Sequence, residues 1–167
     1  QMPKRSGPVS KTFLSKLGCS ALVATLLIPP AHATAQQTAD GDAVVENAWA
    51  PAAEQGGVGT AYFSVRNTTP EPLRLIDART DLASIVALHK TEVDTKGVAR
   101  MSALPTATIE PGVTLTLEPG GFHVMMIDLE KPLLEGQSFP LRLKFYDMDE
   151  LTIEVPILGA TARGPDG

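Results

Sequence analysis

The sequence LRLKFYDMDELTIEV at residues 141–155 decides the fold class. Apolar side chains recur at every second position on both sides of an acidic tip: Leu141, Leu143, Phe145, Leu151, Ile153 and Val155. A period of two buries one face of an extended chain and leaves the other in water, which is the pattern of a β-strand. The stretch therefore predicts two antiparallel strands joined by a turn at Asp147 to Glu150.

The same alternation runs through the chain from Val44 onward. It recurs at residues 61–66 and again at Val113, Leu115 and Leu117, and proline- or glycine-rich turn signals separate these segments. Residues 82–88 alone resemble a helix, but Ile85-Val86 makes a strand equally consistent there. About seven to nine short strands follow, which predicts an all-β protein, either an antiparallel β-sandwich or a small barrel.

The first 33 residues have the parts of a secretory signal peptide. Basic residues precede an apolar run at 17–28, and Ala31-His32-Ala33 closes the segment. Twelve residues span about 18 Å as a helix, too short for a bilayer core of about 30 Å, so no stable membrane insertion is expected after cleavage. Cys19 suggests lipidation, but most of the apolar run follows it, which disfavours that alternative. We therefore expect export to the periplasm.

The remaining chain divides into three parts. Residues 34–43 are small and polar and predict a flexible linker, residues 44–158 form the strand-rich domain, and residues 159–167 predict a disordered tail. Without residues 1–33 the chain keeps ten basic against 19 acidic residues, a formal charge of −9, and it contains no cysteine. Such a charge argues against nucleic acid and anionic lipid as partners.

Histidine and methionine are scarce in this domain, and their positions point to a metal. His123 and Met125 are two apart on one expected strand, so their side chains leave the same face. His89 ends an apolar run, and a hairpin turning near Lys96-Gly97 would return Met101 towards it. Two imidazoles and two thioethers are a soft, neutral ligand set that favours Cu(I) over oxygen-seeking cations. The residues alone leave open whether they are ligands or ordinary structural side chains.

Two other methionines fit a structural role better. Met126 is out of phase with Met125 and in phase with Phe122 and Val124, which predicts a core position. Met148 falls at the acidic tip, where a loosely held surface side chain is expected.

Residues 49–156 resemble the periplasmic copper chaperones of the PCuAC family. Eleven residues separate His89 from Met101, 21 separate Met101 from His123, and His123-Val124-Met125 completes the family's motif, with a first gap one residue longer than usual. Short sequence segments shared with the family surround the motif: Ala48-Trp49-Ala50, Ala61-Tyr62-Phe63 followed by Asn67, Ala87-Leu88-His89, Glu118 to Met125, and Pro132 to Gly136.

The resemblance implies a cupredoxin-like, Greek-key β-sandwich that holds one Cu(I) through His89, Met101, His123 and Met125. It implies a chaperone that supplies copper for the cytochrome oxidase copper centres, together with thiol-bearing oxidase assembly proteins. We expect the protein to be a monomer. A second copper at the C-terminal tail, which some members bind, is not expected because residues 159–167 contain neither histidine nor methionine.

Other functions remain to be weighed. A blue-copper electron carrier needs a cysteine thiolate, which the domain lacks. The sequence contains no nucleophile elbow of the kind that many hydrolases use, so we do not expect an enzyme. Copper buffering or resistance would use the same ligands as delivery, and a β-sandwich interaction module would bind no metal. Both stay open as alternatives.

Overall fold

Eleven strands follow one another along residues 38–167, the part of the chain that the computed structural model describes. They are β1 (Thr38–Asp40), β2 (Ala43–Pro51), β3 (Val58–Asn67), β4 (Leu73–Arg79), β5 (Ala83–Val93), β6 (Ala99–Ala103), β7 (Ala107–Ile109), β8 (Thr114–Thr116), β9 (Phe122–Leu129), β10 (Ser138–Phe145) and β11 (Leu151–Leu158). The predicted signal peptide lies outside the described residues. Within them, no helix is long and apolar enough to cross a membrane.

The all-β prediction is confirmed, but the number of strands exceeds the predicted seven to nine. Three strands, β1, β7 and β8, have only three residues each, too few for a period of two to be recognised. The ambiguous residues 82–88 lie largely in strand β5. The prediction that Val113 lies on a buried strand face is wrong: Val113 precedes β8 and is about half exposed, and its carbonyl accepts the backbone N–H of Asn67 at the end of β3.

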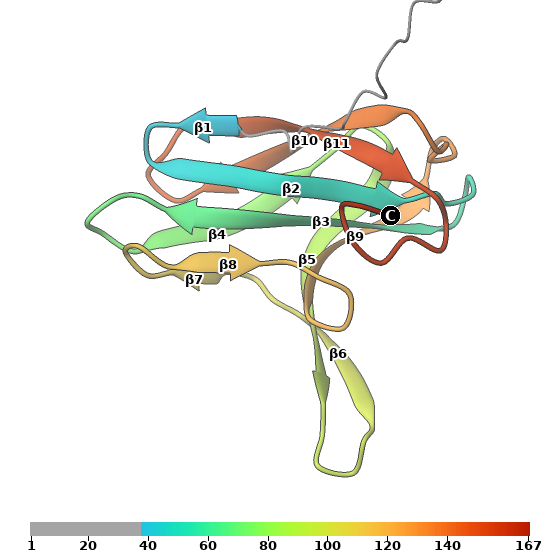
Figure 1. Cartoon of the computed structure of the whole chain (residues 1–167), viewed down its shortest axis with the longest axis horizontal. Coiled ribbons are helices and arrows are strands. Elements are labelled where there is room, and N and C mark those ends of the chain that lie inside the picture. The colour runs from blue at the N-terminus through green and yellow to red at the C-terminus, as the bar shows by residue number, and fades with distance from the viewer. Residues whose placement is uncertain (1–37) are drawn as a thin grey trace, which may run out of the picture. The chain divides into compact units, whose positions relative to one another are not determined.

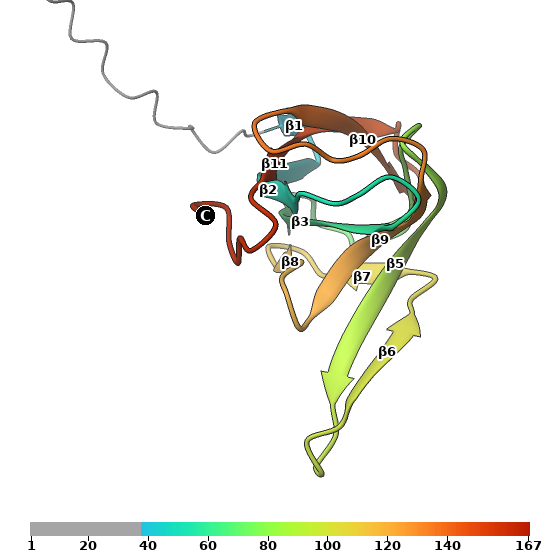
Figure 2. The same cartoon turned by 90° about the vertical axis from the view of Figure 1, so that its right-hand side faces the viewer.

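The strands form one mixed sheet in the order β6-β5-β9-β3-β2-β11-β10-β4-β7, with β1 added to β2 and β8 to β3. Every pair is antiparallel except β2 with β11, which run parallel over two residue pairs, so the purely antiparallel prediction is wrong at this point. The sheet folds over into two layers, with β10 in the upper layer and β3 and β9 in the lower layer of Figure 2.

The core lies between these layers and is built as the first hairpin predicts. Leu141 pairs with Ile153 and Leu143 with Leu151, and all four side chains are buried. They meet Phe63 of β3 and other inward-facing residues in one continuous apolar cluster. Alternate residues of each strand therefore supply the core, as a period of two requires.

A bulge in β2 changes which residues face the core. Asn47 adopts a left-handed backbone with φ of 56°, and the pairing with β3 shifts by one residue between Glu46 and Trp49. Ala48 and Ala50 consequently point inward, whereas Trp49 turns to the outer face and pairs with Tyr62 of β3. The bulge thus places an aromatic side chain on the outside of the sheet.

Strands β5 and β6 extend beyond the rest of the sandwich as a hairpin arm, defined here as residues 89–103 (Figures 1 and 2). Its turn is closed by the Asp94 N–H, which donates to the Val98 carbonyl, and by the Asp94 carboxylate, which accepts the Lys96 N–H. Gly97 takes a φ of 77°, which favours glycine. The tip lies at Lys96-Gly97, as the sequence predicts.

Both ends of the described chain carry local structure. Strand β1 and the start of β2 fall within the stretch expected to be a linker. In the tail, the Ala162 N–H donates to the Gly159 carbonyl, and Arg163 to Pro165 line a hollow of about 170 Å³ together with Trp49.

Candidate metal site

Three neighbouring strands present the four predicted ligands on one face of the sheet. His89 on β5 pairs directly with His123 on β9, and Met125 follows two residues later on the same strand. Met101 on β6 pairs with Thr91, two residues along β5 from His89. Directly paired residues and residues two apart share a face, so the sheet gathers two imidazoles and two thioethers on one side.

The Pro119-Gly120-Gly121 turn sets the orientation of His123. His123 is only 4 % exposed, and its Nδ1 lies 3.1 Å from the Gly121 carbonyl oxygen. A carbonyl only accepts hydrogen bonds, so Nδ1 carries the proton and Nε2 keeps its lone pair for a ligand. The same carbonyl accepts the Thr91 N–H at 3.0 Å, which ties the turn to β5. A second hydrogen bond of this kind is what orients histidines at metal sites.

His89 lies beside His123 with an unsatisfied nitrogen. The two ring centroids are 5.8 Å apart and the rings meet nearly edge to face, at 71°. The His89 Nδ1 is buried and has no hydrogen-bond partner among the described residues. Burial, and to a lesser degree the charge of His123, lowers the pKa of His89. Both effects favour the neutral imidazole, which is the form that binds a metal.

The two thioethers differ in exposure. Met125 is half-buried and pairs with Ala87 on β5 and Thr60 on β3. Met101 lies on the arm and is 52 % exposed. The edge of the candidate site formed by Met101 is therefore open to solvent, while His123 is enclosed and His89 is half-buried.

No group of three or more histidines, cysteines, aspartates or glutamates suited to a metal exists within residues 38–167. A metal site here would accordingly depend on the sulfur atoms, because without the thioethers only two nitrogens remain. Small residues flank the predicted ligands, since Ala103 pairs with His89 and Ala87 with Met125. Neither alanine was identified as a site residue from the sequence, because the register that makes them neighbours is not visible there.

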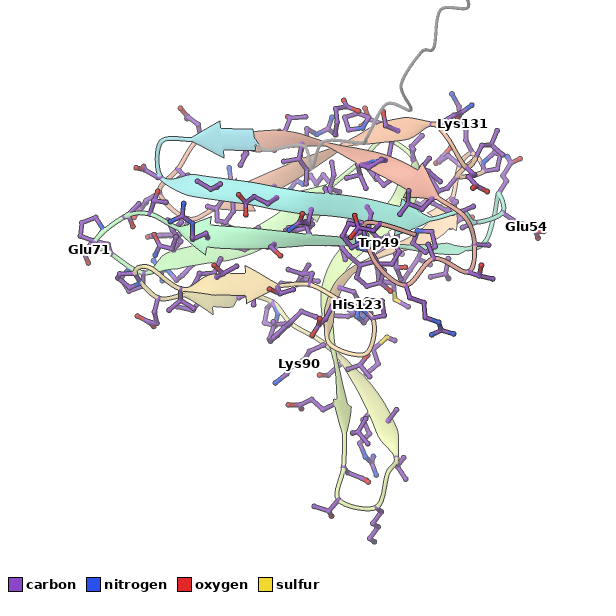
Figure 3. The ribbon with its side chains drawn as sticks, viewed as in Figure 1. Trp49, Glu54, Glu71, Lys90, His123 and Lys131 are labelled. Atoms are coloured by element: carbon purple, nitrogen blue, oxygen red, sulfur yellow. The ribbon has the colours of Figure 1, made fainter. Side chains whose placement is uncertain are left out.

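An aromatic pair continues the same face beyond His123. Ala61 pairs with Val124, so Tyr62 and His123 are the next residues on these two strands. The Tyr62 ring lies 4.6 Å from that of Trp49, centroid to centroid, and both are buried. Figure 3 shows Trp49 on the sandwich above His123, which lies where the arm begins. Both aromatic residues belong to the segments shared with the PCuAC family, but no pattern in the sequence predicts that they lie beside His123.

The remaining methionines lie elsewhere. Met126 is fully buried in the core, as predicted from its phase. Met148 does lie in the β10–β11 turn, but the loose surface position expected for it is wrong, because it is half-buried and packs against the core. Between residues 69–74 and 146–148 there is a hollow of about 780 Å³, which none of the four predicted ligands lines.

Known proteins match both the sequence and the fold. A family model described as "Putative lipoprotein LpqE-like" matches residues 43–157. The relative "Putative lipoprotein Lxx21020" of Leifsonia xyli is 31 % identical over 153 residues, 92 % of this chain and 88 % of that protein.

Solved structures are similar as well. The copper-bound PCuAC domain from PmoF2 superposes with a TM-score of 0.63 at 24 % identity, covering 74 % of this chain and 98 % of that domain. The solution structure of CuI-DR1885 from Deinococcus radiodurans has a TM-score of 0.54 at 30 % identity, over 68 % of this chain and 78 % of that one. The resemblance drawn from the sequence is thereby confirmed: the chain belongs to the LpqE-like family and has the fold of the PCuAC domains.

Proposed function

We propose that this protein is an exported copper chaperone that binds one Cu(I) through His89, Met101, His123 and Met125. The observation that carries the proposal is the gathering of two imidazoles and two thioethers on one face of three neighbouring strands. The buried, unpartnered Nδ1 of His89 supports it, because a buried nitrogen without a partner is costly unless something binds there.

The donor set selects the metal. Thioether sulfur and imidazole nitrogen suit Cu(I), whereas Mg²⁺ and Ca²⁺ require oxygen ligands. Zinc binds imidazole but usually completes its shell with cysteine or carboxylate, and no such group joins His89 and His123 in a cluster within the described residues. Two similar proteins were solved with copper, the PmoF2 domain and DR1885, which makes copper the natural cargo to propose here.

Export rests on the signal features of residues 1–33 and on the family. The Leifsonia relative and the matching family both carry the description "Putative lipoprotein", and lipoproteins are a class of exported proteins. We place this protein in the periplasm, where a carrier that binds through thioethers avoids the oxidation to which thiols are prone.

For the recipient we propose the cytochrome oxidase copper centres, reached with thiol-bearing assembly proteins. A strain lacking the gene is then expected to lose oxidase activity at limiting copper and to regain it when copper is added. Complementation with the Met126→Leu variant should restore activity, whereas Met125→Leu should not. Normal oxidase activity with lowered copper tolerance would instead support buffering or resistance.

The lowered pKa of His89 gives an expectation for acid. In the apo protein the His89 ring should titrate below about 6.5, the ordinary value, so protons compete with Cu(I) at this ligand only below that pH. Because unfolded His89 protonates near about 6.5, the apo fold should lose stability as the pH falls from there towards the folded pKa. NMR titration of the ring protons, with the urea-unfolded chain as control, measures the shift. A midpoint above that of the unfolded chain would contradict it.

A further inference from the structure

The face that carries the predicted copper ligands is apolar well beyond them. The register places Val58 of β3 opposite Ile127 of β9, and Ile127 opposite Ile85 of β5, on the side of Met125 and His89. Val93, at the end of the arm, lies on the same side. Among the described residues, eight large apolar side chains are exposed, and four of them belong to this ligand face: Val58, Ile85, Val93 and Met101.

The other side of the arm is charged. The Lys90 ammonium forms an ion pair with the Glu92 carboxylate at 2.6 Å, and both residues alternate with His89, Thr91 and Val93, none of which is an acid or a lysine or arginine. In Figure 3 the Lys90 side chain points away from His123. One side of the arm is therefore charged and the other carries Val93 and Met101. Covering the second side with a partner protein lowers the free energy, because it removes apolar surface from water.

The size of the ligand face points to a brief contact. From residue 85 to 93 it is about 26 Å long, and its four strands, β3, β9, β5 and β6, span about 14 Å. The resulting area of roughly 400 Å² is half of the about 800 Å² that each partner contributes to a stable interface. Two copies of this protein would, in addition, bring two Cu(I) charges together, because neutral ligands cancel neither. A second copy is therefore a poor occupant.

We propose, on the basis of the copper-carrier function, that the ligand face is where a copper-accepting protein docks. The acceptor's own site is expected to carry cysteine thiols within an apolar rim, which would lie against Ile85 and Val58 at one end and Val93 at the other. Docking of this kind buries apolar surface on both partners and places the acceptor's sulfur over the copper.

Met101 is the ligand exchanged first. It is 52 % exposed, whereas His123 is 4 % exposed and held by the Gly121 carbonyl. An acceptor thiol loses its proton to solvent and forms a bond to copper while the bond to Met101 breaks. Copper remains Cu(I) throughout, so the exchange needs no oxidant or reductant. The anionic thiolate gains attraction to the uncancelled charge that the thioether lacks.

The test is the rate of copper transfer from the loaded protein to a purified, exported domain that binds Cu(I) through two cysteine thiolates. Wild-type transfer should rise and then saturate with acceptor concentration. Val93→Asp and Ile85→Asp should each raise the half-saturating concentration about tenfold, because a carboxylate on the apolar face must be desolvated. Both side chains are more than half exposed, so the fold and the Cu(I) affinity should be unchanged.

Val113→Asp is the matched control, since Val113 is a similarly exposed valine away from the ligand face. It should transfer copper as the wild type does, and transfer from all variants to a small Cu(I) chelator should be equal. Wild-type rates for Val93→Asp and Ile85→Asp with the protein acceptor would overturn the docking face while leaving copper binding intact. Equal slowing with the small chelator would overturn it too. A wild-type protein that gives no copper to the acceptor would refute delivery itself.

Discussion

Replacing Met125 by leucine is expected to lower Cu(I) affinity at least about tenfold and to leave the fold intact. The substitution keeps the side-chain volume and removes only the sulfur, so packing changes little. Removing a residue that only hydrogen-bonds to a metal ligand typically lowers metal affinity about tenfold to hundredfold. Removing a direct ligand should lower it by no less. Competition with a Cu(I) chelator of known affinity measures the change.

Met126→Leu is the matched control, one residue away on the same strand. Met126 is fully buried on the opposite face, so this variant should keep wild-type affinity and lose at most about 1.5 kcal/mol of stability. In the same assay the wild type should take up one Cu(I), which zinc does not displace. Two tight sites, or an affinity loss in Met126→Leu with none in Met125→Leu, would contradict the ligand assignment.

The sequence could predict the shared face of His123 and Met125 because strand geometry alone decides it. Residues two apart on a strand point the same way in every fold. It could also predict the tip of the arm, since the Asp94 carboxylate and Gly97 act within five residues of each other. Local rules of this kind, together with the spacing of the four predicted ligands, account for the part of the candidate site that the sequence predicts.

The register between strands is a different matter. Whether His89 faces His123 depends on which residues of β5 and β9 pair, and no local pattern specifies that. The bulge at Asn47 also cannot be recognised in the sequence. A single residue with a left-handed backbone turns Trp49 outward, and the residue types of β2 do not indicate where it occurs. The sequence therefore located the predicted ligands but not the alanines and aromatic residues that surround them.

Asn67→Ala is expected to cost about 3 kcal/mol of folding stability. The Asn67 side chain is fully buried, and its amide nitrogen donates to the carbonyls of Glu71 and Ile109, at 2.7 and 2.9 Å. Its amide oxygen accepts the backbone N–H and the hydroxyl of Thr69. One side chain thus joins the end of β3, the following loop and strand β7. Alanine would leave these groups without their partner, at about 1–3 kcal/mol for each buried one.

Urea unfolding of the apo protein measures this cost as a lower midpoint with an unchanged slope. Thr68→Val is the control: its exposed hydroxyl bonds only the Gly41 carbonyl, so its loss should change stability by less than about 0.5 kcal/mol. Figure 3 shows Glu71, an Asn67 partner, at one end of the sandwich and His123 away from that end, where the arm begins, so folded Asn67→Ala should bind Cu(I) as tightly as the wild type. Weakened copper binding in the folded variant would instead mean that the hydrogen bonds of Asn67 at the end of β3 affect the position of Tyr62, on the same strand, and of the candidate metal site.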